Sequence, residues 1–332
     1  MIDNKGPKIV VIGGGTGSFT LLSELKYYSQ DITALVNMAD DGGSTGQLRD
    51  EYGVLPPGDV RQCLVALSNS PKARDLFNYR FEDGTLKGHA FGNLFLTALE
   101  KMSGNFADGV ELASEVLRIT GSVEPITHTN IELCMKTNDG KTLKGEFKIG
   151  HAKFKGSRPE FWLEPEAVLS QKAKEAILNA DMVVIAPGNL YGSLAPALIV
   201  PGVYDALNIS NAKKVYVCNL VTKPGQTDKY KVNDFAAEIE RLAGGEFLDY
   251  VIYNTARPSK ELLKKYANDG EYAVDIDSKK LKKAHYCAKG RDVISDKITF
   301  NRQKSDPIAS ARTLIRHDPV KVTKAIMQVY FS

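Results

Sequence analysis

Two patterns of hydrophobic and polar positions alternate along the chain. Short apolar runs rich in β-branched residues predict buried strands, and apolar residues at every third or fourth position predict amphipathic helices. In the stretch 18–28, Leu21, Leu25 and Tyr28 fall at i, i+4 and i+7, which puts them on one helix face. The predicted strands are 8–12, 31–38, 181–188, 213–220 and 248–255, and the clearest predicted helices are 18–28, 234–243 and 259–267.

The order of these elements indicates the fold. A strand, a helix and a second strand open the chain, and the same order returns in its second half. Such β-α-β units form parallel sheets that helices cover on both faces. We therefore expect an α/β fold, a Rossmann-like open and mostly parallel sheet with helices on both faces. Because no stretch rich in Pro, Ser or Gly separates two halves, residues 1–332 are expected to form a single nucleotide-binding domain.

The pattern changes between about 128 and 163. Residues alternate there around "TNDGKT", and Asp139 with Gly140 is a strong signal for a two-residue hairpin turn, since such turns need positive φ. We expect a small β-hairpin insertion in this stretch, at an edge of the main sheet.

Composition and charge limit the kinds of partner. The 332 residues include 43 basic and 40 acidic side chains, and the net charge of +3 gives no reason to expect nucleic-acid binding. No apolar run approaches ~18 residues and no signal-peptide core opens the sequence, so we expect a cytoplasmic protein without a membrane span. The four cysteines, Cys63, Cys134, Cys218 and Cys287, lack C-x-x-C spacing, and each is expected to be a small buried hydrophobe.

The segment "IGGGTGSF" at 12–19 follows the first strand and opens the first helix. Gly13, Gly15 and Gly17 let the backbone approach an anion closely, and the N–H groups of a starting helix point toward it. The spacing departs from G-x-G-x-x-G because Ser18 stands in place of the third glycine, and no P-loop lysine follows. The segment is a candidate phosphate-binding turn, with a structural tight turn as the alternative.

Amide side chains gather where the predicted strands end. Ligands of open parallel sheets bind outside the carboxyl ends of the strands. Asn37, Asn189, Asn219 and Asn254 all fall at or near such ends. An amide both donates and accepts, which suits the edge of a base or a sugar hydroxyl. Because asparagine also favours turns, a structural role stays open for each position.

Two adjacent carboxylates, Asp40 and Asp41, lie in the glycine-rich stretch after the second strand. They can bind Mg²⁺ through oxygen ligands and bring it to a diphosphate, which makes Mg²⁺ a possible cofactor. They can equally accept hydrogen bonds from sugar hydroxyls, or only cap turns. The spacing of the two residues leaves all three roles open.

The stretch 87–102 offers a second helix start. Gly92 and Asn93 stand where a cap is expected, and His89 is a candidate for phosphate contact or acid catalysis, although a histidine without a visible partner is more often structural. Asp59 is expected to cap the helix that follows it, with Arg61 as a candidate for reaching an anion.

Several segments together resemble one family of proteins. The motifs are "GGGTGSFTLLSEL", "DITALVNMADDGGSTGQLRDEYGVLPPGDVRQCLVAL", "GHAFGNLFLTAL", "APGNLYGSLAPALIVPGV", "VYVCNLVTKPGQTD" and "LIRHDPVKV". From about residue 7 to about residue 325 the chain resembles the gluconeogenesis factor family. The resemblance implies a cytoplasmic bacterial protein that binds a nucleotide sugar such as UDP-N-acetylglucosamine. Such proteins are needed for normal cell shape and cell-wall metabolism on gluconeogenic carbon sources.

The resemblance also implies ligand contacts. It places the diphosphate at the glycine turn and the nucleotide near the next polar strand ends, at Gly14, Gly15, Thr16, Gly17, Asp40, Asp41 and Asn189. It points to Tyr266 and Arg316 for the sugar nucleotide, where a packed ring and an ion pair with Asp318 are the structural alternatives. The strand-end pattern adds Asn219. A regulator of this kind requires no cofactor, has an unknown protein partner and is compatible with a homo-oligomer.

The family is similar in fold to the 2-phospho-L-lactate transferases of deazaflavin-coenzyme biosynthesis, which use a divalent metal and a deazaflavin acceptor. Those transferases resemble the chain in the glycine turn and the aspartate region. They have a bulkier loop in place of "GGSTGQ" and a "PDLDT"-like segment in place of "LPPGDVRQ". Because a shared fold does not carry a reaction with it, we expect a non-catalytic nucleotide-sugar-binding regulator. A metal-dependent transferase acting on a phosphorylated small molecule is the alternative hypothesis.

Overall fold

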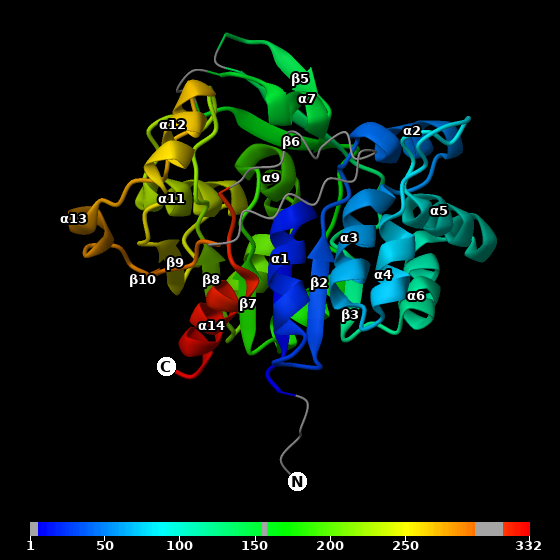
Figure 1. The fold of residues 1–332 in the computed structure, drawn as a ribbon, viewed down its shortest axis with the longest axis horizontal. Coiled ribbons are helices and arrows are strands. Elements are labelled where there is room, and N and C mark those ends of the chain that lie inside the picture. Colours follow the sequence, from blue (N-terminus) through cyan, green and yellow to red (C-terminus); the bar gives the residue numbers. More distant parts are fainter. Residues whose placement is uncertain (1–5, 138, 155–157, 296–314) are drawn as a thin grey trace.

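A computed structural model describes residues 6–137, 139–154, 158–295 and 315–332 (Figure 1). Its centre is a seven-stranded sheet in the order β10-β9-β8-β7-β1-β2-β3, and all neighbouring strands pair in parallel. The strands are β1 (Ile9–Gly13), β2 (Ile32–Val36), β3 (Ser122–Pro125), β7 (Met182–Ile185), β8 (Lys213–Val217), β9 (Tyr250–Asn254) and β10 (Cys287–Arg291). The expected Rossmann-like α/β fold is confirmed.

The strand order changes direction between β1 and β7. From β1 the chain moves to β2 on one side, whereas from β7 it moves through β8 and β9 to β10 on the other. Since crossovers between parallel strands are right-handed, the two directions place helices on opposite faces of the sheet. α1 (Gly15–Leu25), α3 (Pro57–Leu67) and α14 (Pro319–Tyr330) lie in front of the sheet in Figure 1, and α1 packs against both of the others.

The central strands are buried because they are apolar along their whole length. All residues of β1 and of β7 are buried, and β-branched side chains dominate both. The apolar stripe of α1, with Leu21 and Leu25, is buried as well. The expected helix 18–28 begins earlier, at Gly15, because the glycine segment forms its first turn. Tyr28, expected on the buried stripe, lies beyond the helix and is 37% exposed.

The other expected elements of the second half are present. The strands expected at 181–188, 213–220 and 248–255 are β7, β8 and β9, and the two expected helices are α11 (Val232–Ala243) and α12 (Lys260–Asn268). The remaining helices are α2 (Gly43–Tyr52), α4 (Pro71–Asn78), α5 (Phe91–Ser103), α6 (Phe106–Leu117), α8 (Gln171–Asn179), α9 (Ala195–Leu198), α10 (Val203–Ile209) and α13 (Ser278–Leu281), with a π-helical turn, Leu190–Leu194, before α9.

The helix caps expected at Asp59 and at Gly92 with Asn93 were wrong. α3 begins at Pro57 and α5 at Phe91, so Asp59 and Asn93 lie inside the first turns. A proline at the first helical position sets the start of α3, because its fixed φ suits a helix and its missing N–H would have no partner there. Both polar side chains are thereby left to contact other elements.

The segment between 128 and 163 forms the expected hairpin, but not at the expected place. β4 (Glu132–Lys136) and β5 (Thr142–Lys144) pair antiparallel across a turn in which Gly140 has φ +82°. β6 (Glu160–Glu164) pairs with the other side of β4, so a separate three-stranded sheet results instead of an edge of the main sheet. This sheet and α7 (Glu146–His151) lie above the carboxyl ends of the parallel strands in Figure 1. The insertion therefore covers the edge at which ligands of this fold bind.

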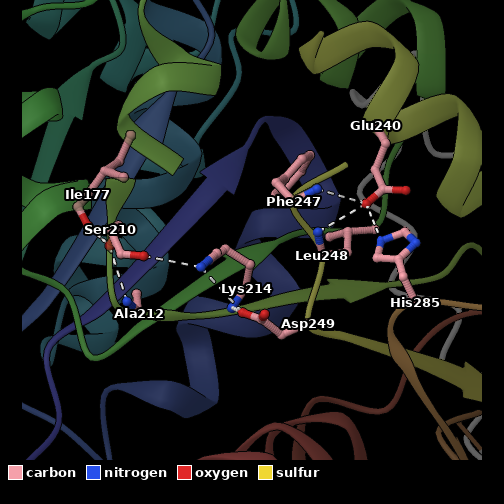
Figure 2. Close-up of polar contacts among 9 residues, drawn as sticks. All are labelled: Ile177, Ser210, Ala212, Lys214, Glu240, Phe247, Leu248, Asp249 and His285. Atoms are coloured by element: carbon pink, nitrogen blue, oxygen red, sulfur yellow. Dashed lines mark hydrogen bonds and ion pairs between the residues drawn. The ribbon is translucent and has the colours of Figure 1, made fainter. Parts of the chain in front are cut away.

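A buried carboxylate fixes the end of α11 to the start of β9. Glu240 is 6% exposed and accepts hydrogen bonds from the N–H groups of Phe247 and Leu248, each at 3.0 Å (Figure 2). Nε2 of His285 lies 2.9 Å from the same oxygen. With its partners close by, this carboxylate avoids the cost of an unpaired buried charge. The contact lies at the amino end of β9, away from the insertion.

The cysteines follow the expectation with one exception. Cys63, Cys134 and Cys218 are buried, whereas Cys287 is exposed, so the prediction was wrong for that residue. Cys287 opens β10, which is the edge strand of the sheet as far as the described residues show.

Among the described residues, no single helix is long and apolar enough to cross a membrane. The segments Leu190–Leu198 and Val203–Ile209 reach that length and composition only as a pair, and the pair is bent by 72°.

Candidate functional site

A cavity of about 550 Å³ opens where the strand order reverses, between β1 and β7. Loops after β1, β7 and β8 line it together with the end of α7 and the segment before α14, and the lining includes Thr16, Gly17, Asn189, Asn219, Lys223 and Arg316. Open parallel sheets bind ligands at this place, because the loops on the two sides diverge there. The volume lies within the range of about 300–1,000 Å³ that small-molecule sites occupy.

The glycine turn brings α1 close to the loop after β7. A Cβ atom on Gly17 would lie 1.6 Å from the carbonyl oxygen of Pro187, so only glycine permits this approach. Gly15 has φ +58°, which side chains other than glycine rarely adopt. The N-cap residue, Gly14, has no side-chain acceptor for the first N–H groups of α1. Of the four expected diphosphate contacts, Thr16 and Gly17 line the cavity.

Asp59 occupies part of the helix start that was expected to hold an anion. Its carboxylate accepts a hydrogen bond from the N–H of Gly15, and a Cβ atom on Gly14 would lie 2.0 Å from its Oδ2. Gly14 and Gly15 therefore contact a carboxylate of the chain itself. An external phosphate would meet the next residues of the turn, which open into the cavity.

Four carboxylates crowd beside this turn. Burial first, and then the charge of Asp40, raise the pKa of Asp59 to about 7. Burial, followed by the charges of Asp40, Asp59 and Asp41, raises the pKa of Glu146 to about 8. Burial also raises the pKa of Asp40. Asp59 and Glu146 therefore tend to keep a proton near neutral pH, because like charges and low polarity disfavour their ionised forms.

The carboxylates do not form a ready metal site. In the part of the chain that the structure describes, no group of three or more His, Cys, Asp or Glu side chains could hold a metal ion. Asp41, one of the two candidate ligands, accepts a hydrogen bond from the N–H of Phe147 at 2.7 Å and so fixes the start of α7. Asp40 accepts from the N–H of Gly42 at 3.1 Å. The described residues do not fit a preformed Mg²⁺ site.

The four strand-end asparagines all fasten loops. Asn189 bonds to backbone groups of α7 and of the π-helical turn at 3.4 and 3.3 Å, and Asn219 donates to the carbonyl of Gly188 at 2.6 Å. Asn37 and Asn254 bond to backbone groups two residues ahead. A structural role is therefore visible for all four. Ligand contact by Asn189 and Asn219, which also line the cavity, stays a prediction.

Tyr266 and Arg316, expected at the sugar nucleotide, lie in different surroundings. Arg316 lines the cavity. Tyr266 is 7% exposed, and its hydroxyl accepts a hydrogen bond from the N–H of Ile315 at 2.9 Å, so it holds the segment that carries Arg316. The carboxylate of Asp318 accepts the N–H of Lys321 at 2.9 Å and caps α14. Direct ligand contact by Tyr266 stays a prediction, while its packing role is visible.

A chain of hydrogen bonds connects α3, α5 and α2 near the carboxylates. Arg61 Nε donates to Oδ1 of Asn93 at 2.9 Å, which orients the amide so that its Nδ2 donates to Ser44 Oγ at 3.2 Å. The hydroxyl of Ser44 is then left to donate to Nδ1 of His89, 2.9 Å away. His89, which showed no partner in the sequence, thus has one, and Arg61 is engaged within the protein.

Three residues of the site were not predicted from the sequence. Lys223 and His151 line the cavity, and Glu146 joins the carboxylates from α7. The motif "VTKPGQTD" carried a signal for Lys223, because it places a lysine in the loop that follows a predicted strand. Glu146 and His151 gave none, since local pattern does not tell where an insertion lies over the sheet.

The comparisons with known proteins bear on this site. The family model described as 2-phospho-L-lactate transferase CofD matches residues 9–297. A relative from Clostridium acetobutylicum is 43% identical over 92% of this chain and 68% of that relative. The protein of Bacillus subtilis named gluconeogenesis factor is 38% identical over 97% of this chain and 98% of its own length. The chain belongs to the gluconeogenesis factor family.

A solved structure of the family shares the fold. The crystal structure of a UPF0052 family member from Bacillus halodurans matches with a TM-score of 0.87 at 37% identity, over 97% of this chain and 99% of that chain. The resemblance drawn from the sequence motifs is thereby confirmed. The first residue of the last of those motifs, at position 314, lies outside the described residues.

Proposed function

We propose that the protein binds a nucleotide sugar, represented by UDP-N-acetylglucosamine, and acts in the cytoplasm as a regulator needed for cell shape and cell-wall metabolism on gluconeogenic carbon sources. The cavity at the reversal of strand order carries the proposal. It joins the start of α1, where a diphosphate is favoured, to amide and hydroxyl side chains that suit a sugar or a base. Relatives named gluconeogenesis factor support the role in carbon metabolism.

The use of the polar groups favours a regulator over an enzyme. Asp41 and Asn189 bond to the backbone of α7, and the carboxylates behind the glycine turn retain protons. Group transfer needs a base or a metal presented to the ligand. Two polar groups of the site, the Asp41 carboxylate and the Asn189 amide, are instead engaged in holding the insertion over the sheet.

A transferase acting on a phosphorylated small molecule, with a deazaflavin as acceptor, is the second candidate. The match to a family model described as 2-phospho-L-lactate transferase favours it. Against it stands the segment "LPPGDVRQ", where those transferases have a "PDLDT"-like sequence.

Thermal unfolding with different ligands separates the two candidates. A ligand that binds only the folded state raises the Tm, so UDP-N-acetylglucosamine should raise it while free N-acetylglucosamine and a deazaflavin leave it unchanged. The shift should be the same with Mg²⁺ and with EDTA. Stabilisation by the deazaflavin in the presence of Mg²⁺, together with transfer of a phospholactyl group, would replace the regulator with the transferase.

A further inference from the structure

Lys223 lies on a firmly held loop of the cavity. It opens the turn after β8, where its N–H donates to Oγ1 of Thr227 at 2.8 Å and its carbonyl accepts the N–H of Thr227 at 2.9 Å. Gln226, 4% exposed, donates through Nε2 to three carbonyl oxygens at the end of α7, at 2.9 to 3.1 Å. The backbone that carries Lys223 is therefore fixed both to itself and to the insertion.

Lys223 lines the cavity, and among the described residues its ammonium group has no hydrogen-bond or ion-pair partner. Across residues 6–137, 139–154, 158–295 and 315–332, no acceptor or carboxylate lies within hydrogen-bond or ion-pair distance of its Nζ. Glu146 and Glu271 interact with Lys223 only through longer-range electrostatics. Burial raises the pKa of both carboxyl groups, so their negative charge compensates the ammonium less well. By contrast, the buried Lys26 donates to two carbonyl oxygens at the end of α3, at 2.9 and 2.6 Å.

We propose that Lys223 binds a phosphate group of the ligand, together with the first turn of α1. A partly buried ammonium gains from a nearby anion, and the fixed turn keeps the backbone that carries it at the cavity wall. The same cavity wall supplies the partial positive charge of a helix start, the hydroxyl of Thr16 and a second cation, Arg316. Glu271 is the acidic residue of the described lining, so cations outnumber carboxylates there.

A diphosphate fits this distribution better than a single carboxylate does. Its charge is spread over two groups, which lets one group meet the helix start while the other meets the ammonium. The inference deepens the proposed function and rests on it only for the nucleotide and sugar parts of the ligand. Inorganic pyrophosphate therefore tests the phosphate subsite by itself.

Binding to Lys223 can be observed directly in the wild-type protein. Reductive ¹³C-methylation labels the lysines, and the Lys223 resonance is the one that disappears in Lys223→Gln. Pyrophosphate should move that resonance and raise the pKa of the amine, because a bound anion favours its charged form. The proposal is overturned if saturating pyrophosphate or UDP-N-acetylglucosamine leaves the resonance and its titration unchanged.

Calorimetry on two variants measures how much Lys223 contributes to the affinity for the ligand. Lys223→Gln should lower the affinity for pyrophosphate and for UDP-N-acetylglucosamine by about ten- to a hundredfold, which is the loss expected for one charge-assisted hydrogen bond. Lys229→Gln makes the same charge change at an exposed position of the same loop and should leave both affinities within about twofold. Equal affinities in wild type and Lys223→Gln would refute the subsite.

The outcomes for this subsite and for the proposed function can be told apart. If UDP-N-acetylglucosamine binds both proteins equally, the function stands and the role of Lys223 falls. If pyrophosphate binds through Lys223 but the nucleotide sugar does not bind, the subsite stands and the proposed ligand falls. If neither binds the wild type, both fall. Melting curves of the two variants show whether each is folded.

Discussion

The carboxylates behind the glycine turn lead to the most specific prediction, the effect of Asp59→Asn on stability. The pKa of Asp59 is raised from 3.8 to about 7, by burial and by the charge of Asp40. Between about pH 4 and pH 7 the folded state therefore binds a proton that the unfolded state has released, so stability falls as the pH rises through this window. Above pH 7 the loss is complete.

The size of the loss in folding stability follows from the pKa shift of Asp59. A difference of about three pKa units corresponds to about 4 kcal/mol. Asparagine imitates the neutral acid at equal size and keeps an acceptor for the N–H of Gly15. Because part of the shift belongs to the repulsion from Asp40, we expect Asp59→Asn to raise the free energy of unfolding by about 2–4 kcal/mol at pH 8. At pH 4 the gain should be under about 1 kcal/mol.

Urea denaturation followed by circular dichroism between pH 4 and pH 8.5 provides the assay. The control is Asp75→Asn, which makes the same chemical change at an exposed site of α4 and should alter stability by less than about 0.5 kcal/mol at any pH. The reasoning is refuted if Asp59→Asn destabilises the protein at pH 8, or if its effect does not depend on pH. The first result would mean that the carboxylate is ionised and paired in the folded state, and the second that folding does not shift its pKa.

Three further predictions concern the glycine turn and the helix α7 of the insertion. Gly17→Ala should cost about 1–3 kcal/mol in urea denaturation, because its Cβ would lie 1.6 Å from a backbone oxygen; an unchanged midpoint would show that α1 can move away. Asp41→Ala should speed amide hydrogen exchange in α7, whereas Asp41→Asn, which keeps an acceptor for the N–H of Phe147, should not; equal exchange in both variants would contradict the role given to this side chain. Phe147 is 52% exposed, and its ring lies 4.3 Å from that of His151, which lines the cavity. Phe147→Ala should therefore leave the free energy of unfolding within about 0.5 kcal/mol. If the two rings stack on the base, the same change should weaken the binding of UDP-N-acetylglucosamine by about 1–3 kcal/mol in calorimetry, and unchanged affinity would place the base elsewhere.

Much of the main sheet could be predicted because its strands are continuous apolar runs. β1 and β7 are buried on both faces, so each is a run of consecutive apolar residues that can be recognised from the local sequence alone. The start of α1 was misplaced because glycine has a low helix propensity, yet here Gly15 and Gly17 form the first turn. The requirement for close packing against the loop after β7 outweighed propensity, and that loop lies far away in the sequence.

The candidate site was predicted in part for the same reason. The glycine turn and the loops after β7 and β8 could be located, since strand ends in a parallel sheet share one edge. What the side chains do there depends on contacts across the sequence. Asp41 bonds to Phe147, 106 residues away, and Gln226 bonds to Ile149, 77 residues away. A local pattern cannot distinguish an asparagine or aspartate that meets a ligand from one that fastens an insertion.

The most direct test of the proposed function is a crystal structure of the protein with UDP-N-acetylglucosamine. The account predicts the diphosphate in the cavity between β1 and β7, between the first turn of α1 and the ammonium of Lys223, with no metal ion required. Ligand density on the carboxylate side instead, with a cation joining the diphosphate to Asp40, would contradict it. So would an empty cavity at a ligand concentration that saturates the protein in solution.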